Sequence, residues 1–478
     1  MAMASTKHVV LFPFPGQGHL VSFLEAARLL RCVLPGDVSI TLVSTPRNVA
    51  ALRASASASS PSSLDISFHA LPFLPADHGL PADCESTSSI PPPAYLMLFE
   101  AFESLEPAFD AYISSLAAEC GSVCVIADVF VAWTVGVARR RGCAHAVFVS
   151  CGAFGTAILH DLWKNMPALP FGDDGLLRLP AFPEVELHRS QMSQVFLSSP
   201  SLGMDRLIAF HDRQTQHGYL TDAVLMNTVQ ELEPTGLAIV RRTLGKQVPV
   251  CSIGPLVGDG SAGTATDDGV AVMRWLDSQP PSSVLYISFG SQNSIRRKQM
   301  MELATALEST GRPFVWAFRP PVGLHPNIDG VEEWLPAGFE ARARAANRGL
   351  LVHGWAPQVS ILAHASTGAF LSHCGWNSVL ESLTHGVPIV GWPLSAEQFY
   401  NVKTLAEEWG VCVEVARGNL ESSTVESCKV AQVVETAMGA EMRQRAAAVK
   451  EVLKKAWAED GGSSRTALQE FLGVVRLH

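Results

Sequence analysis

The alternation of short apolar runs with segments of helical period constrains the fold of this chain more than any other feature. The apolar runs are rich in β-branched residues, and amphipathic segments such as residues 20–33 and 95–117 lie between them. This alternation is typical of parallel βαβ units, in which a helix follows each strand and covers the sheet. The predicted strands are residues 8–14, 38–44, 65–71, 123–128, 146–150, 223–227, 284–289, 313–318, 350–354 and 368–372. We therefore predict an α/β protein with parallel sheets.

The length of the chain predicts two domains, because 478 residues exceed what one ordinary hydrophobic core holds. Residues 252–269 are rich in Gly, Ser, Thr and Asp, which is the composition of an exposed linker. The predicted domains on either side of this linker cover residues 1–251 and 270–457. A separate C-terminal helix is predicted at residues 458–478.

Two segments share a pattern that suggests how each domain binds a ligand. Residues 8–20 (HVVLFPFPGQGHL) and 283–295 (SVLYISFGSQNSI) both run from a predicted strand into a glycine-containing turn before a helix. Two doubly wound domains would each contain such a strand–turn–helix segment. In such domains ligands bind at the carboxyl ends of the strands, where these turns lie. Residues 75–93 and about 167–200 lack strong periodicity, and we predict functional loops there.

Charge and cysteine usage exclude several classes of protein. The formal net charge of −10 argues against a nucleic-acid-binding protein, which needs a basic face. The ten cysteines form no CxxC pair, so we expect ordinary thiols in a reducing compartment. The longest apolar stretch, residues 123–138, is interrupted by Asp128 and is shorter than the ~20 residues of a membrane span. Because the N-terminal residues also lack a signal-peptide pattern, we expect a soluble, cytoplasmic protein.

The most informative segment is residues 355–398, which read WAPQVSILAHASTGAFLSHCGWNSVLESLTHGVPIVGWPLSAEQ. Aromatic, histidine, amide and carboxylate side chains are combined there with turn and helix-start signals. A predicted strand ends near Ser372, and the following helix ends at Gly386, two residues before Pro388. Such a segment is suited to a ligand with a ring, a phosphate and many hydroxyls.

The start of that helix is predicted to bind an anion. Backbone N–H groups around Gly375 to Ser378 point out of the helix, and the helix dipole favours negative charge at this end. The side chains of His373, Asn377 and Ser378 add hydrogen-bond donors at the same place. We therefore predict a diphosphate site at residues 373–378.

The segment resembles, nearly position for position, the plant secondary-product glycosyltransferase signature, which binds UDP-sugars in family 1 glycosyltransferases. The resemblance implies that Trp355 stacks on the uracil and that Gln358 reads the edge of the nucleobase or ribose. It also implies that Glu381 accepts both ribose hydroxyls, while Glu397 and Gln398 bond the sugar hydroxyls. The implied UDP-sugar site comprises Ser291, Trp355, Ala356, Gln358, His373, Gly375, Trp376, Asn377, Ser378, Glu381, Glu397 and Gln398.

Some of these residues also have a purely structural interpretation. Ser378-x-x-Glu381 and Ser395-x-x-Gln398 both match the capping box of a helix start. Trp355 alone would read as a core aromatic at the end of a strand. Ser291 resembles the residue that touches the β-phosphate, but a plain turn serine is the alternative.

Two motifs in the first half of the chain extend the resemblance, PFPGQGH (13–19) and DVFVAW (128–133). They imply that His19 is the catalytic base and that Asp128 is its partner. The positive end of a helix disfavours imidazolium, which would keep His19 neutral, and Asp128 would hold the imidazole in one tautomer. The alternatives are a structural histidine in a glycine-rich turn and an aspartate that caps the helix near Val131.

The resemblance covers essentially the whole chain and implies the glycosyltransferase B fold, in which two Rossmann-like domains face each other across a cleft. In that fold the N-terminal domain binds the acceptor and the C-terminal domain binds the UDP-sugar. The implied reaction is transfer of glucose from UDP-glucose with inversion, since a glutamine such as Gln398 at the end of the signature accompanies this donor. The chain has no Asp-x-Asp triplet, so we expect neither a metal nor another cofactor. No obligate protein partner is indicated.

The acceptor is expected to be a small apolar molecule, such as a flavonoid, another phenolic, a terpenoid or a hormone. The candidate pocket residues are Phe130, Trp133, Phe154, Trp163, Met192 and Phe196, each of which is also suited to a hydrophobic core. Another donor sugar, a nitrogen, sulfur or carbon acceptor, and a non-catalytic UDP-sugar sensor remain alternatives. A dinucleotide oxidoreductase is disfavoured, because Gly16-x-Gly18 is followed by Val21 where the third glycine is needed.

Overall fold

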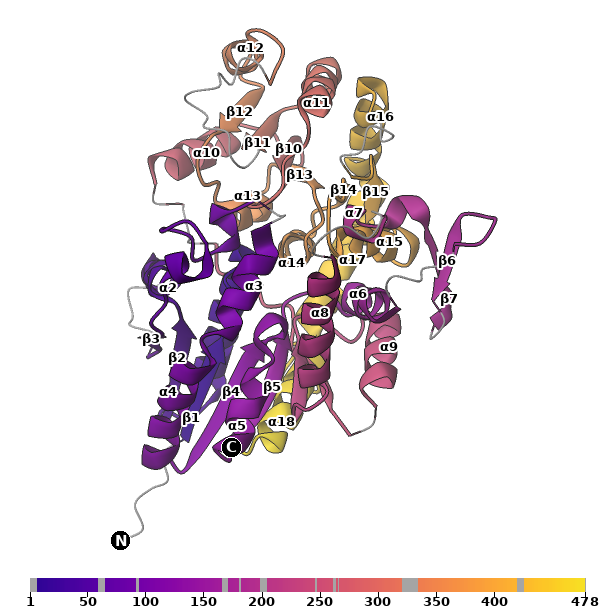
Figure 1. Cartoon of the computed structure of the whole chain (residues 1–478). Helices are drawn as coiled ribbons and strands as arrows, with labels where there is room; N and C mark the ends of the chain where they lie inside the picture. The colour runs from indigo at the N-terminus through magenta and orange to yellow at the C-terminus, as the bar shows by residue number, and fades with distance from the viewer. Residues whose placement is uncertain are drawn as a thin grey trace. The chain divides into compact units, whose positions relative to one another are not determined.

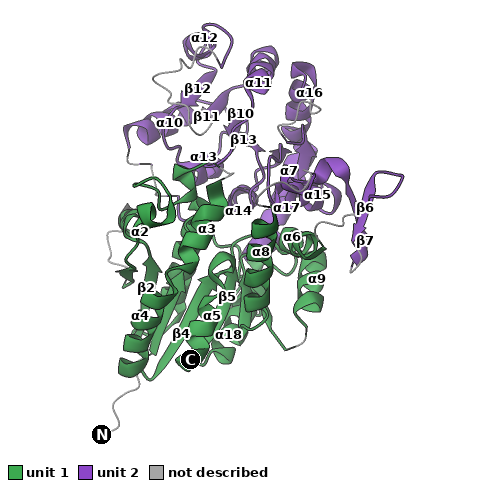
Figure 2. Ribbon diagram, viewed as in Figure 1, with its two compact units in different colours: residues 1–170, 198–256, 455–478 green, residues 171–197, 257–454 purple. Residues whose placement is uncertain are grey.

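The computed structural model of the chain contains two compact units (Figures 1 and 2). Unit 1 comprises Met1–Pro170, Ser198–Leu256 and Lys455–His478, and unit 2 comprises Phe171–Leu197 and Val257–Lys454. The residues that the structure describes are 7–58, 65–91, 94–165, 171–179, 182–197, 204–245, 247–260, 264, 266–319, 334–418 and 425–477.

Unit 1 is built on a seven-stranded parallel sheet with the order β3-β2-β1-β4-β5-β8-β9. Its strands are β1 (Lys7–Phe12), β2 (Val38–Ser44), β3 (Ser67–Ala70), β4 (Ser122–Asp128), β5 (Ala144–Val149), β8 (Ala223–Met226) and β9 (Val250–Ser252). From β1 the chain proceeds outwards to β2 and β3, and then returns to add β4 on the other side of β1. The strand order therefore reverses between β1 and β4, which makes their carboxyl ends the switch point of the sheet.

Helices connect these strands, as parallel pairing requires. The α-helices of unit 1 are α1 (Gln17–Val33), α2 (Pro46–Ala58), α3 (Tyr95–Glu103), α4 (Glu106–Glu119), α5 (Thr134–Arg140), α6 (Ala153–Asn165), α8 (Met204–Gly218), α9 (Pro234–Leu244) and α18 (Ser463–Val474). Its 3₁₀ helices include η1 (Pro75–His78), η2 (Thr87–Ser89) and η4 (Val129–Val131). The predicted helix at 95–117 is two helices, α3 and α4, with Ser104 and Leu105 between them.

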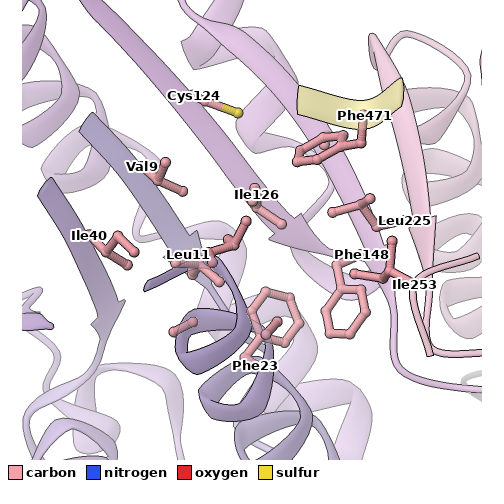
Figure 3. Packing of buried hydrophobic residues seen from close by; sticks show 14 of the residues in the cluster. Val9, Leu11, Phe23, Ile40, Cys124, Ile126, Phe148, Leu225, Ile253 and Phe471 are labelled. Carbon is pink, nitrogen blue, oxygen red and sulfur yellow. The ribbon is translucent and has the colours of Figure 1, made fainter. Parts of the chain in front are cut away.

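Both faces of the unit 1 sheet are buried, and β1 shows this directly. Val9 and Leu11 belong to a core cluster with Phe23 and Phe148, whereas Val10 and Phe12 belong to a second cluster on the opposite face. Because side chains alternate along a strand, a nearly continuous apolar run is what a doubly covered parallel strand needs. Figure 3 shows the first cluster, in which Phe471 of α18 also packs.

The C-terminal residues pack within unit 1. Ser464, at the start of α18, is fully buried, and its hydroxyl donates a hydrogen bond to the carbonyl of Gly254 at 2.6 Å. Phe471 and Leu477 are also fully buried in the core cluster of this unit. Residues far apart in the sequence therefore complete one hydrophobic core, and α18 covers part of the sheet near β8 and β9.

Unit 2 is built on a six-stranded parallel sheet with the order β12-β11-β10-β13-β14-β15. Its strands are β10 (Val284–Ser288), β11 (Phe314–Ala317), β12 (Gly349–Val352), β13 (Thr367–Ser372), β14 (Ile389–Gly391) and β15 (Cys412–Glu414). The strand order reverses between β10 and β13, in the same way as between β1 and β4. Each unit is thus an independent doubly wound α/β fold with its own switch point.

The remaining elements of unit 2 are helices and one hairpin. The α-helices are α7 (Gln194–Leu197), α10 (Asp267–Asp277), α11 (Arg297–Thr310), α12 (Phe339–Ala345), α13 (Gln358–Ala363), α14 (Trp376–His385), α15 (Gln398–Glu407), α16 (Ser427–Ala437) and α17 (Ala440–Lys455). The hairpin pairs β6 (Leu176–Leu179) with β7 (Phe182–His188) in an antiparallel sheet, and the 3₁₀ helix η5 (Arg189–Gln191) follows.

The structure differs from the sequence-based expectation in the segment around residues 167–200. Instead of an irregular loop, its described part contains the β6–β7 hairpin. The segment 171–197 also groups with unit 2, although it lies within the predicted first domain, 1–251. The contacts that hold it include hydrogen bonds from Tyr400 to Met192 Sδ at 3.9 Å and from Arg417 to Ser190 at 2.5 Å. These partners are more than 200 positions away in the chain, so the local sequence does not predict the contacts.

Two other differences concern short elements. The predicted linker, 252–269, overlaps the start of α10, where Thr266 caps the helix by accepting the N–H of Gly269 at 3.1 Å. Strands β9, β14 and β15 each contain three residues, and the sequence predicted none of them. Such short strands hold too few residues for a recognisable period. Among the described residues, no helix combines the length and apolar character that crossing a membrane requires.

Removing the Phe23 side chain should destabilise unit 1. This ring is fully buried and packs edge-on against Phe148 at a centroid distance of 4.9 Å, so Phe23→Ala should cost about 3–5 kcal/mol. Val33 lies on the same helix but is 45% exposed, so Val33→Ala should cost no more than about 0.5 kcal/mol. Calorimetric melting should show a clear loss for Phe23→Ala only, and equal melting temperatures for the two variants would contradict this packing.

Candidate active site

The predicted catalytic pair of unit 1 lies at the switch point of its sheet. Strand β1 ends at Phe12, which is in register with Ala127 of the neighbouring strand β4. Beyond these ends, His19 lies in the first turn of α1 and Asp128 is the last residue of β4. Because the two strands are parallel and adjacent, residues 109 positions apart come together at one edge of the sheet.

His19 and Asp128 form a short, largely buried contact. The distance between His19 Nδ1 and Asp128 Oδ2 is 2.6 Å, and the side chains are 20% and 0% exposed. A carboxylate can only accept, so Nδ1 carries the proton of this bond and Nε2 is left as the basic nitrogen. The second oxygen of Asp128 accepts the N–H of Phe130 at 3.1 Å. Asp128 therefore both contacts His19 and caps η4.

Several neighbours fix the His19 ring. The hydroxyl of Ser150 is 3.3 Å from Nδ1, while the rings of Phe14 and Phe130 lie 5.7 and 5.6 Å from the imidazole centroid. A Cβ on Gly16 would lie 2.9 Å from His19 Cδ2, closer than atoms normally approach. The glycine of this turn is thus needed so that the imidazole can pack against the backbone.

The predicted donor residues of unit 2 also gather at a switch point. Ser291 lies in the turn after β10, and residues 373–378 follow the end of β13. The backbone of Cys374 has φ = +61°, which is unusual for a non-glycine residue and directs the chain sharply into α14. Gly375 is the N-cap of α14 and makes no side-chain cap bond. The start of this ten-residue helix therefore offers backbone N–H groups and the positive end of its dipole.

His373 is held tightly beside this helix start. Its ring lies between two glycines, since a Cβ on Gly290 or on Gly375 would come within 2.7 or 2.6 Å of its atoms. Burial lowers the pKa of His373 to about 4, against an opposing hydrogen bond with the Ser288 backbone. The ring is therefore neutral at physiological pH. Its Nδ1 is buried, and no hydrogen-bond partner for it exists among the described residues.

Gln358 connects the start of the predicted donor segment to its middle and to β10. Its side-chain N–H₂ donates to Ser378 Oγ at 2.9 Å and to Glu381 Oε2 at 2.6 Å, and its Oε1 accepts the hydroxyl of Tyr286 at 3.1 Å. Ser378 lies inside α14 and is not its N-cap, so the capping-box interpretation of Ser378 and Glu381 is wrong. Glu381 is instead part of a polar network at the carboxyl edge of the sheet.

Trp355 is not a core residue. It is 49% exposed, and the guanidinium carbon of Arg319 lies 5.3 Å from its ring centroid. Ala356, the next residue, is buried and supports the turn into α13 through a 2.8 Å bond from the N–H of Gln358 to its carbonyl. An indole held at the edge of a sheet with half its surface exposed is well placed to stack on a flat ring.

The last two residues of the donor segment are both buried, and one of them is engaged in holding the loop. Gln398 Oε1 accepts the N–H groups of Leu394 and Ser395 at 2.9 and 3.0 Å, but Ser395 is not the N-cap of α15, so the capping-box interpretation of this pair is also wrong. Glu397 precedes α15 as its N-cap, and Ala396 before it has φ = +52°. Left-handed residues other than glycine cost free energy and are concentrated at functional sites. Trp376 is buried in α14, and Asn377 beside it is half-buried.

The six predicted acceptor residues are divided between the two units. Phe130 is half-buried against His19, and Trp163 stacks on His211 at 4.0 Å, a ring that also contacts Phe130. Trp133 is a core residue, packed edge-on against Phe12 and Phe109. The others are buried: Phe154 begins α6 in unit 1, whereas Met192 and Phe196 belong to unit 2.

Several residues around the site were not identified from the sequence. Ser150 follows β5, Tyr286 lies within β10, and Arg319 comes two residues after the end of β11. Like Asp128, Ser150 and Arg319 are polar residues at or just beyond the end of a parallel strand, and this position is a signal that could have identified them. Asn401 supports Cys374 by donating to its carbonyl at 2.9 Å. The pairing of Tyr286 with Gln358 depends on a strand-to-helix contact that no local pattern shows.

Comparison with known proteins assigns both halves of the chain to families. Residues 223–442 match the family described as UDP-glucoronosyl and UDP-glucosyl transferase, and residues 6–258 match the N-terminal domain of glycosyltransferases. UDP-glycosyltransferase 92A1 of Arabidopsis thaliana is 40% identical over 99% of this chain and 98% of its own. Crocetin glucosyltransferase 3 of Crocus sativus is 40% identical over 88% of this chain and 89% of its own.

A solved structure extends the likeness to the fold. UGT2 of Phytolacca americana, in complex with UDP-2fluoro-glucose and pterostilbene, superimposes with a TM-score of 0.78 at 28% identity. The match covers 99% of this chain and 100% of that one. The two parallel-sheet units therefore have the glycosyltransferase B architecture.

Acid should destabilise the protein through His373. Its pKa is about 4 when folded and about 6.5 when unfolded, so between these values only the unfolded chain binds the proton. The free energy of unfolding should therefore fall as the pH is lowered through this range. His373→Asn should show a shallower fall than the wild type. Urea unfolding at pH 7, 6 and 5 measures this, and identical slopes for wild type and His373→Asn would refute it.

Proposed function

The chain belongs to the plant family 1 UDP-glycosyltransferases, and on that basis we propose that it is an inverting, UDP-glucose-dependent O-glucosyltransferase. The acceptor in this proposal is a small apolar molecule with a hydroxyl group. Glycosyl transfer from a UDP-sugar is the activity of the family. The proposal adds that the sugar is glucose and that the accepting atom is an oxygen.

The contact between His19 and Asp128 carries the proposal. A buried carboxylate 2.6 Å from Nδ1 fixes the tautomer in which Nε2 accepts a proton, and it stabilises the imidazolium that results. A protein that only bound UDP-sugars would have no use for this pair. The pair therefore favours an enzyme that deprotonates a hydroxyl over a sensor.

The start of α14 supplies the second requirement, stabilisation of the leaving group. Its N–H groups and dipole attract the diphosphate, and the neutral ring of His373 lies beside this helix start without the cost of a buried charge. The backbone donors at the start of α14 act on the same diphosphate charge that a metal ion would neutralise, so the proposed reaction includes no metal ion.

The proposed reaction is a single displacement. The acceptor oxygen attacks the anomeric carbon of UDP-α-glucose from the face opposite UDP, and its proton passes to Nε2 of His19. A bond forms between this oxygen and the anomeric carbon while the bond from that carbon to the β-phosphate oxygen breaks. UDP leaves with the electron pair, and its charge is met at the start of α14. The product is a β-glucoside.

Glucose as the donor sugar is supported by Gln398 at the end of the donor segment, the residue that accompanies UDP-glucose in the resembled signature. The Crocus sativus relative is named a glucosyltransferase, and the Phytolacca americana enzyme was solved with a fluorinated UDP-glucose. An apolar acceptor is supported by Phe130 and Phe14, whose rings flank His19 in unit 1.

A donor screen tests the function directly. UDP-glucose, UDP-galactose and UDP-glucuronate should each be incubated, with EDTA present, with a mixed panel of plant phenolics and terpenoids and analysed by mass spectrometry. We expect a hexose adduct with UDP-glucose and little product with the other donors. Adducts mainly from another donor would overturn the choice of sugar, and dependence on added metal would overturn the metal-free reaction. Bound UDP without any adduct would favour the sensor.

Replacement of His19 separates chemistry from donor binding. His19→Ala should lower kcat by about 10²- to 10⁴-fold, because the acceptor hydroxyl loses its base. The Kd for UDP should hardly change, because the predicted donor residues all belong to unit 2. Ser150→Ala is a suitable control, since that hydroxyl is 3.3 Å from His19 and Asp128 still orients the ring. Full activity of His19→Ala towards a hydroxyl acceptor would remove His19 from the mechanism.

A further inference from the structure

Arg319 and Trp355 are brought together by two neighbouring strands of unit 2. Strands β11 and β12 are parallel, with Ala317 in register with Val352, and the N–H of Phe318 donates to the Val352 carbonyl at 3.0 Å. The chain leaves both strands at the same edge of the sheet. Arg319 lies just beyond one strand and Trp355 just beyond the other, and the guanidinium carbon is 5.3 Å from the indole centroid.

The charge of Arg319 is otherwise poorly compensated. Its side chain is half-buried, and burial lowers its pKa against the opposing influence of Tyr286. Within the part of the chain that the structure describes, no carboxylate lies within ion-pair distance of this guanidinium. By contrast, Arg312 at the other end of β11 pairs with Glu435 at 2.6 Å. A partly desolvated guanidinium without an anion gains most from the face of an aromatic ring.

The backbone of Arg319 is also anchored. Its carbonyl accepts the hydroxyl of Ser294 at 3.2 Å, which ties the end of β11 to the segment after β10. Trp355 is followed at once by buried Ala356 and by Gln358, whose side chain is fixed by Tyr286, Ser378 and Glu381. The turn that carries Trp355 is thus held by several hydrogen bonds, and the indole ring itself contacts Arg319.

An indole has two faces, and Arg319 covers one of them. Because 49% of Trp355 remains exposed, the opposite face is accessible to a flat ligand. We propose that Arg319 is a positioning residue of the donor site, which holds the Trp355 indole in the orientation that receives the uracil on its other face. The inference rests on the proposed function in one respect, that Trp355 is the stacking residue for the base.

The inference predicts which part of the ligand is affected. Arg319 acts through Trp355 on the base, so its loss should weaken the binding of uridine, UMP and UDP by the same factor. A direct contact between the guanidinium and the phosphates would behave differently, because the loss would grow with the number of phosphates and would shrink at high salt. The set of three ligands therefore separates positioning from charge attraction.

A double-mutant cycle in the full-length protein tests the inference, with Kd values for UDP, UMP and uridine from calorimetry. Arg319→Met should raise each Kd by about three- to tenfold, the range of a partly desolvated cation–π contact. In a Trp355→Leu background the same substitution should have no further effect, since its only route to the base is gone. Arg319→Lys, which keeps a cation over the ring, should recover part of the loss. Arg312→Met, which removes the ion-paired arginine just before β11, should leave the Kd values unchanged.

Three outcomes would overturn the inference. Equal losses from Arg319→Met in both backgrounds would show that it does not act through Trp355. A loss confined to UDP would assign Arg319 to the phosphates, and an unchanged Kd for all three ligands would remove it from the site. In each case wild-type binding and transfer stay intact, so the proposed function survives. Failure of the wild-type protein to bind UDP would overturn both the inference and the proposed function.

Discussion

Parallel strand pairing is the constraint on which the rest of this structure depends. In each sheet the strand order reverses once, between β1 and β4 in unit 1 and between β10 and β13 in unit 2. At these points the connections diverge to opposite sides, and the carboxyl ends of two adjacent strands are left uncovered by their own helices. His19 and Asp128 occupy one such place, and Ser291 and His373 follow the strands at the other. The same backbone geometry thus provides two different chemical sites.

The two sites use burial in opposite ways. In unit 1 the fully buried carboxylate of Asp128 accepts hydrogen bonds from two donors, the imidazole of His19 and the N–H of Phe130, and so holds the ring in one tautomer. In unit 2 burial keeps His373 neutral, and the positive charge for an anionic ligand comes from the helix dipole of α14. Glycines make both arrangements possible, because a Cβ on Gly16 or Gly375 would collide with the imidazole beside it.

Sequence-based predictions succeeded for features that neighbouring residues determine, and they failed for contacts between residues that are distant in the chain. Ten strands were predicted close to their observed positions, since long apolar runs report burial on both faces. The capping-box interpretation failed for Ser378 and for Ser395, because the N-caps of α14 and α15 are Gly375 and Glu397. Trp133 and Phe130 are near neighbours in the sequence, but only Phe130 faces His19. Local sequence does not show which of the two faces His19. Trp133 is buried because it packs against Phe12 and Phe109, and these contacts exist only in the folded chain.

The sequence by itself determined the class of fold, the family and the candidate donor and catalytic residues, because these depend on periodicity and on motifs that are contiguous in the chain. Only the tertiary structure decided which side chains meet. It brought Asp128 to His19, Tyr286 to Gln358 and Arg319 to Trp355, and it grouped residues 171–197 with unit 2. Each of these contacts joins elements that are distant in sequence and adjacent in a sheet or in a packed layer. Their free energy comes from register and packing across the fold, which a local pattern of residues does not encode.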